Sequence, residues 1–98
     1  MKTLDKLENL LIGEEGLLIS LRMGEGFKKE LFHEICSLLK QLAEQWAKEV
    51  SIPKRAVGIF VDLYPSMESA SYLYNESERI EILEAADIIA DLIRECCN

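Results

Sequence analysis

Tyrosines and carboxylates alternate through the stretch between positions 62 and 81. Tyr64, Glu68 and Tyr72 follow one another at intervals of four, the spacing that places side chains on one face of a helix. Tyrosine offers a large rigid contact surface with a polar tip, and carboxylates pair with arginine and lysine. The mixture predicts a surface that binds a basic protein, although half-buried tyrosines and merely solvated acids are the alternative. The residues assigned to this surface are Asp62, Tyr64, Glu68, Tyr72, Tyr74, Glu76, Glu78 and Glu81.

The net charge of −7 comes entirely from the C-terminal part of the chain. Residues 1–61 hold nine acidic and nine basic side chains, whereas residues 62–98 hold nine acidic ones against only Arg79 and Arg94. A concentrated negative surface repels nucleic acid and anionic lipid and speeds the encounter with a basic partner. We therefore expect a protein partner and neither a nucleic acid nor a membrane.

A second chemistry open to these acids is metal binding on the last helix. Glu84, Asp87 and Asp91 resemble half of the Mg²⁺ site of all-helical nucleotide pyrophosphohydrolases, in which carboxylates hold cations that bridge phosphates. The other half of that pattern is a Glu-Glu-x-x-Glu shortly upstream, but Glu30 and Glu34 lie about fifty residues away. No cluster of Lys or Arg is available for a triphosphate. We expect no metal, no cofactor and no catalytic residue, and keep the Mg-dependent enzyme as a lesser alternative.

The single histidine and the three cysteines give no further catalytic signal. His33 falls on the polar face of a predicted helix, with no acid and nucleophile beside it. An odd number of cysteines that includes the vicinal pair Cys96 and Cys97 is a poor disulfide framework, so we expect reduced thiols.

The strongest predicted element is a helix from Asn75 to Cys97. Asn75 can cap its first turn, and Glu78 can return a bond to the amide of the cap. An apolar stripe of the helix consists of Ile82, Ala86, Ile89, Ile93 and Cys96, and an acidic stripe consists of Glu84, Asp87, Asp91 and Glu95.

The stretch from Phe27 to Val50 predicts a second long helix with a wide apolar face. That face is formed by Phe32, Cys36, Leu39, Ala43, Trp46 and Val50, with Phe27, Leu31, Ile35, Leu38 and Leu42 beside them. A face of this width needs two neighbouring helices, or a second copy of the chain in a homodimer.

Two further helices complete the predicted fold. Residues 3–23 carry a stripe of leucines that continues past Gly13 and Gly16, which favours one helix with a weak point between these glycines. Because glycine disfavours a helix, the alternative is a break there between two shorter helices. Another helix is expected from Pro53, kinked near Tyr64 and Pro65. Its segment from Val57 to Val61 is β-branched enough for a strand, but the chain offers no second strand to pair with it.

These elements predict an all-α protein, an antiparallel up-down four-helix bundle that forms a single domain over residues 1–98. No apolar run approaches the roughly 20 residues of a membrane span, and the N-terminus lacks a signal-peptide core, so we expect a cytoplasmic protein.

The run from Ala56 to Ile93 resembles the C-terminal half of small helical immunity proteins, which protect bacteria from colicin-type or contact-dependent-inhibition toxins that cleave RNA. The resemblance covers about 40% of the chain and lies in its general pattern: an apolar helix, a tyrosine-rich acidic turn and an acidic helix. It implies an inhibitor that binds a basic nuclease domain and covers its active site with acidic side chains. Glu68, Tyr72, Glu76 and Glu78 occupy the region that would do so. The alternative from another class is a self-associating helical adaptor or regulatory subunit.

Overall fold

The computed structural model describes residues 2–98 and shows only α-helices joined by short links. The helices are α1 (Lys2–Ile12), α2 (Leu17–Arg22), α3 (Lys29–Gln45), α4 (Lys54–Ser71) and α5 (Glu76–Cys97). No strand occurs within residues 2–98, which confirms the all-α prediction. Within the same residues, no helix combines the length and the apolar character needed to cross a membrane.

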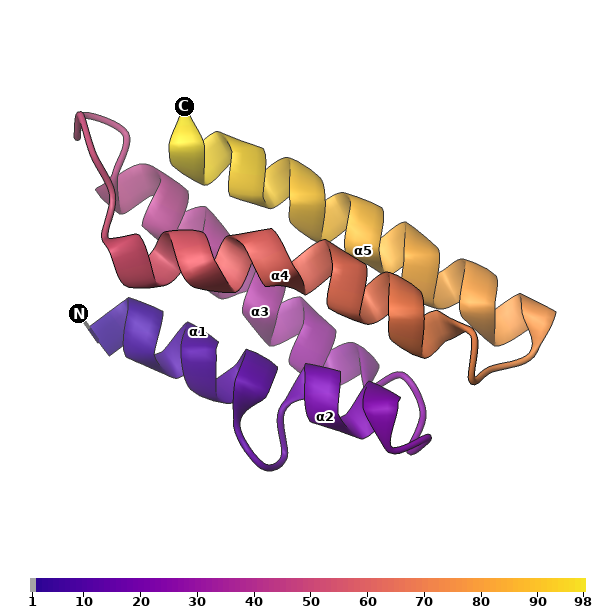
Figure 1. Ribbon diagram of the computed structural model, residues 1–98. Helices are drawn as coiled ribbons and strands as arrows, with labels where there is room; N and C mark the ends of the chain where they lie inside the picture. The colour runs from indigo at the N-terminus through magenta and orange to yellow at the C-terminus, as the bar shows by residue number, and fades with distance from the viewer. Residues whose placement is uncertain (1) are drawn as a thin grey trace.

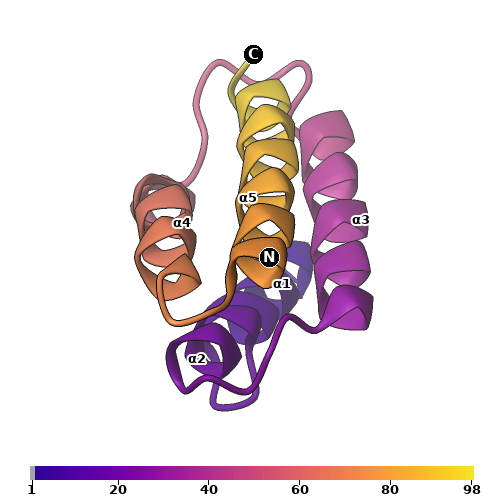
Figure 2. The same cartoon turned by 90° about the vertical axis from the view of Figure 1, so that its right-hand side faces the viewer.

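The helices form an antiparallel four-helix bundle, in which α1 and α2 together make the first arm (Figure 1). Figure 2 shows α5 between α3 and α4, with the α1–α2 arm covering the remaining side. Within that arm, α1 packs against α3 and α2 packs against α4. The bundle measures 42 × 23 × 21 Å. Because α5 touches both long neighbours, its charged outer face lies beside α3 on one side and α4 on the other.

The first arm is broken, so the favoured single helix over residues 3–23 is wrong and the alternative of two shorter helices is confirmed. Helix α1 ends at Ile12 and α2 begins at Leu17 after a tight turn. A Cβ atom on Gly13 would lie 2.4 Å from the Asn9 carbonyl oxygen, and one on Gly16 would lie 2.8 Å from that of Leu11. The turn therefore requires glycine at both positions. The predicted leucine stripe still enters the core on both sides of the break, as Leu4, Leu7, Leu11, Leu18 and Leu21.

Helix α3 is shorter than predicted at both ends. It starts after Gly24 and Gly26, whose φ angles of 75° and 98° suit glycine and turn the chain away from α2. It ends at Gln45, so Val50 is fully exposed and its predicted place on the buried stripe was wrong. Trp46 is buried as predicted, and its ring meets that of Phe60 edge-on with centroids 6.4 Å apart.

Helices α4 and α5 form as the sequence pattern predicts. Helix α4 includes Val57 to Val61 and continues through Pro65 to Ser71, so the segment is not a strand; the bend near Pro65 stays a prediction. At the start of α5, the Asn75 side chain accepts from the Glu78 amide at 2.8 Å. The predicted return bond from the Glu78 carboxylate is not formed among residues 2–98. Four members of the α5 apolar stripe are buried, and Ile93 is half-buried.

Candidate protein-binding surface

All nine acidic side chains of residues 62–98 reach solvent on α4 and α5. Only Glu81 is half-buried, and the other eight are exposed. Those eight are Asp62, Glu68, Glu76, Glu78, Glu84, Asp87, Asp91 and Glu95. The charge asymmetry of the sequence is therefore a property of the molecular surface over these two helices.

The two arginines of this region are engaged within the chain. The Arg79 guanidinium lies 4.3 Å from the centre of the Tyr72 ring, a cation–π contact. Its buried Nε donates to no acceptor in the described part of the chain. Arg94 forms an ion pair with Asp91, three residues earlier on the same helix. These contacts fix both cations locally and leave the remaining acids without a balancing charge from residues 62–98.

Tyr64 of α4 and Asp87 of α5 line the same surface groove. The groove is lined by Tyr64, Asp87, Ala90, Asp91 and Arg94. Tyr64 is half-buried, and the negative charge of Asp87 raises the pKa of its hydroxyl, with burial and Glu68 adding to the effect. Asp87 was absent from the predicted binding set. No sequence signal could place it there, because its position beside Tyr64 depends on how the two helices pack.

Asp62 lies on the other side of α4 from the Tyr64 groove. It lines a second groove, between α2 and α4, together with Arg22, Pro65 and Leu73. Residues two apart on a helix point about 200° away from each other, which separates Asp62 from Tyr64. The predicted binding set is thus divided between the two flanks of α4.

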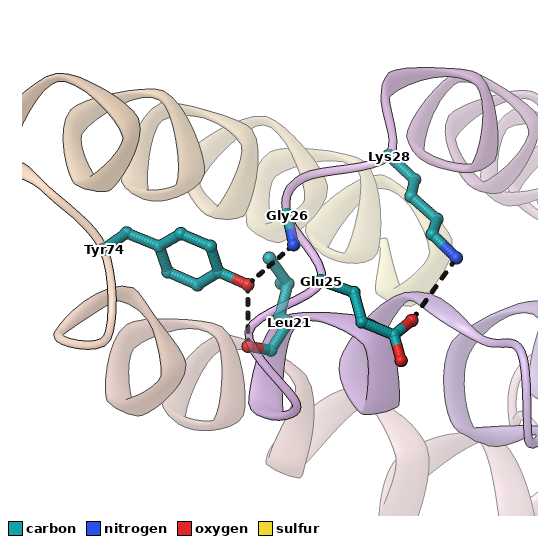
Figure 3. A network of polar contacts seen from close by, with 5 residues as sticks. All are labelled: Leu21, Glu25, Gly26, Lys28 and Tyr74. Carbon is teal, nitrogen blue, oxygen red and sulfur yellow. Dashed lines mark hydrogen bonds and ion pairs between the residues drawn. The ribbon is translucent and has the colours of Figure 1, made fainter.

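Tyr74 holds two turns of the chain together. Its hydroxyl donates to the Leu21 carbonyl oxygen at 2.8 Å and accepts from the Gly26 amide at 3.1 Å. Figure 3 shows these bonds joining the link between α4 and α5 to the turn that precedes α3, where Glu25 and Lys28 form an ion pair at 3.7 Å. Since the side chain is half-buried and its hydroxyl is occupied, Tyr74 stabilises the fold at the edge of the predicted surface.

The three predicted glutamates of α5 differ in their surroundings. Glu81 pairs with Lys29 of α3 at 3.1 Å and ties the two helices together. Glu76 and Glu78 are exposed in the first turn of α5, where the helix dipole favours carboxylates. The latter two are free to meet a partner, whereas Glu81 would first have to release Lys29.

The residues of the alternative chemistries do not form a site in the described part of the chain. No group of three His, Cys, Asp or Glu side chains there is placed to hold a metal ion. The three cysteines are free: Cys97 is exposed, Cys36 is partly buried, and Cys96 is buried with its Sγ 3.3 Å from the Leu39 carbonyl oxygen. Burial raises the pKa of the Cys96 thiol to about 11, with smaller contributions from Cys97 and Glu95, which keeps this thiol protonated and unreactive at neutral pH.

The outer face of α4 and the turn that follows it carry exposed apolar side chains, of which the sequence predicted a role only for Tyr72. The largest exposures belong to Tyr72, Val61 and Leu73, at 69%, 65% and 62%. The sequence signal for them was a run of apolar residues too wide for one buried stripe.

A scan against protein-family models and searches of curated proteins and of solved structures find no match for this chain.

Proposed function

We propose that this chain is an acidic immunity-type or antitoxin-type protein that binds and inhibits a basic toxin domain, in particular a nuclease domain. The observation that carries the proposal is the concentration of exposed acids on α4 and α5. Eight exposed carboxylates lie there, and the two arginines of the same region are bound to Tyr72 and Asp91. A surface of this kind complements a domain that binds phosphates through lysine and arginine.

Tyr72 is the proposed anchor within the acidic surface. It is 69% exposed at the C-terminal end of α4, so a partner can reach most of its ring. Arg79 beneath the ring restricts its motion before binding, which lowers the entropy lost when a partner docks. Carboxylates precede and follow Tyr72 in the chain: Glu68 lies one turn earlier on α4, and Glu76 lies at the start of α5. Together they offer one aromatic contact surrounded by acceptors for basic side chains.

The charge predicts how association would depend on salt. Long-range attraction to a basic domain raises the association rate, and it is screened beyond about 10 Å at 0.1 M salt. The association rate should therefore fall as salt is added, while the dissociation rate should depend mainly on anchors such as Tyr72.

The first test is genomic and cellular. The proposal expects the gene for this chain to adjoin one for a large toxin or a basic nuclease domain. Co-expression of this chain should then restore growth to cells that make that toxin domain. A neighbouring toxin domain that this chain neither binds nor neutralises would refute the proposal.

The second test measures binding kinetics against the same toxin domain. Glu68→Lys should slow association about tenfold at low salt. Position 68 lies near the end of α4, where the helix dipole tolerates a lysine, so the fold should persist. Glu34→Lys is the matched control, because it makes the same charge change at an exposed position of the neutral half.

Tyr72→Ala should mainly speed dissociation, by about thirtyfold or more if Tyr72 is a hot spot. Thermal melts of every variant show whether it is folded. Association that is independent of salt, or full protection by a variant lacking Glu68, Tyr72, Glu76 and Glu78, would place the interface elsewhere.

A further inference from the structure

The outward face of α4 exposes an apolar stripe that runs up to the edge of the acidic region. Val57, Val61 and Pro65 follow at intervals of four and are all exposed, Val57 by 46% and Val61 by 65%. Gly58 lies beside them, and a Cβ atom built on it would have no atom of residues 2–98 within 4 Å. We call Val57, Gly58, Val61 and Pro65 the α4 stripe.

The α4 stripe is not explained by the stability of the fold. Neither valine packs against the core, and Gly58 makes no close approach that would require a glycine. In an exposed helical position, glycine costs about 1 kcal/mol relative to alanine, valine is a poorer helix former than a straight-chain residue, and proline removes a hydrogen bond. The same residues leave apolar surface in water. A stripe that disfavours both the helix and solvation points to a surface that is covered by a partner.

Carboxylates border the α4 stripe on both sides. On the α5 side lie Glu68 and Asp87, next to Tyr64. On the α2 side lies Asp62, in the groove that also contains Arg22. Three acids thus lie around the stripe against two cations, Arg22 and the exposed Lys54 one turn before Gly58. The other nearby cations are paired, Arg94 with Asp91 and Arg55 with Asp5. This arrangement complements a segment with one apolar face and with lysine or arginine along its edges.

We propose that the α4 stripe is the docking site for a basic amphipathic helix of the partner protein. The proposal rests on the proposed function and specifies where and by what kind of segment the partner is held. The α4 stripe runs from Val57 to Pro65, about 12 Å along the helix axis, which seats about two turns of a partner helix. The missing side chain at Gly58 lets the partner approach the α4 backbone there.

Charge argues against a second copy of this chain as the occupant. Two copies that met through their α4 stripes would bring together two surfaces on which Asp62, Glu68 and Asp87 outnumber Arg22 and Lys54. Each chain also carries a net charge of −7. Both effects oppose self-association and favour a basic occupant.

The test uses two synthetic helical peptides of about 18 residues, made of leucine and lysine in equal numbers. In the amphipathic peptide the leucines fall on one face; in the scrambled peptide they are spread around the helix at the same charge. Backbone amide NMR spectra of the folded chain are recorded during titration with each. The amphipathic peptide should bind at least about tenfold more tightly and shift the signals of α4 around Gly58.

A pair of charge-adding variants separates docking on the stripe from plain charge attraction. Val61→Glu makes the surface more acidic, so charge attraction alone would strengthen peptide binding. Because the change also removes an apolar contact, docking on the stripe predicts an affinity for the amphipathic peptide about tenfold lower. Ile88→Glu is the matched control, because Ile88 is an exposed apolar residue of α5 at 48% exposure. It should leave the affinity unchanged or raise it slightly.

Three outcomes would overturn the inference. Equal binding of the two peptides, or no binding of either, would show that no apolar docking face exists. Signal shifts confined to α5 would put the contact elsewhere. A dimer in light scattering that Val61→Glu dissociates would put a second copy on the stripe. These outcomes do not depend on the toxin experiment. If the chain neutralised a toxin domain through Tyr72 alone, the proposed function would be supported and this inference would be refuted.

Discussion

Helices α4 and α5 are antiparallel neighbours whose inner faces are alike and whose outer faces differ in composition. Inside, both bury a mixture of alanines and large apolar side chains, such as Ala56 and Leu63 on α4 and Ala86 and Ile89 on α5. Outside, α5 presents acids together with the exposed Ile80 and Ile88, and it starts with a side-chain cap from Asn75. Helix α4 has no side-chain cap bond at its start, and its outer face contains a glycine, a proline and exposed valines.

The difference indicates what the two outer faces are for. The outer face of α5 favours its own helix, because acids suit the first turn and no helix-breaking residue interrupts it. The outer face of α4 opposes its helix, so α4 depends on packing against α2 and α5 to keep its shape. A surface that costs stability in this way is explained better by binding than by folding.

The largest expected effects concern the inner faces, where the two helices should behave alike. Leu63→Ala on α4 and Ile89→Ala on α5 each truncate a side chain that is 1% exposed. Each should lower the free energy of unfolding by about 3 kcal/mol, measured by urea denaturation. A much smaller loss for Leu63→Ala would show that α4 is only loosely attached to the core.

Tyr74→Phe tests the link between the two helices. The change removes the hydroxyl that bonds to the Leu21 carbonyl and the Gly26 amide, and should cost about 1.5 kcal/mol of unfolding free energy. Tyr72→Phe is the control, since Tyr72 is exposed and its hydroxyl makes no hydrogen bond within residues 2–98; it should cost less than about 0.5 kcal/mol. Equal effects would contradict a structural role for Tyr74.

Asn75→Ala tests the capped start of α5. Loss of the bond from the Glu78 amide to the Asn75 side chain should cost about 1 kcal/mol, measured by thermal or urea unfolding. Asn75→Asp keeps an acceptor at the same place and should be close to neutral. If Asn75→Ala were also neutral, α5 would not owe its stability to a local signal, and the contrast with α4 would weaken.

Gly58→Ala tests the outer face of α4 and should be stabilising. The new methyl group meets open space, so the helix should gain about 0.7 kcal/mol, seen as a small rise in melting temperature. Gly24→Ala is the control: its methyl group also meets open space, but the φ of 75° there disfavours alanine, and the variant should be less stable. A destabilised Gly58→Ala variant would mean that the glycine is needed for folding.

The sequence by itself determined the helical class, the core and the sign of the charged surface. Local patterns sufficed because a helix places every third and fourth residue on one face, and because Asn75 marks a helix start through its own side chain. Two errors were also local. Gly13 and Gly16 could be tolerated within a helix or break it, and Val50 was counted on a stripe that the helix end at Gln45 cuts short.

Only the tertiary structure decided which charged and aromatic residues meet. Asp62 and Tyr64 are two residues apart but face different neighbours, whereas Tyr64 and Asp87 are far apart in sequence and share a groove. Tyr74 bonds to Leu21 and Gly26, and Arg79 lies against the Tyr72 ring. Both contacts depend on how the links between the helices fold back. The physical reason is that periodicity fixes which side of a helix turns inward, while the neighbour that each remaining side meets is set by how whole helices pack.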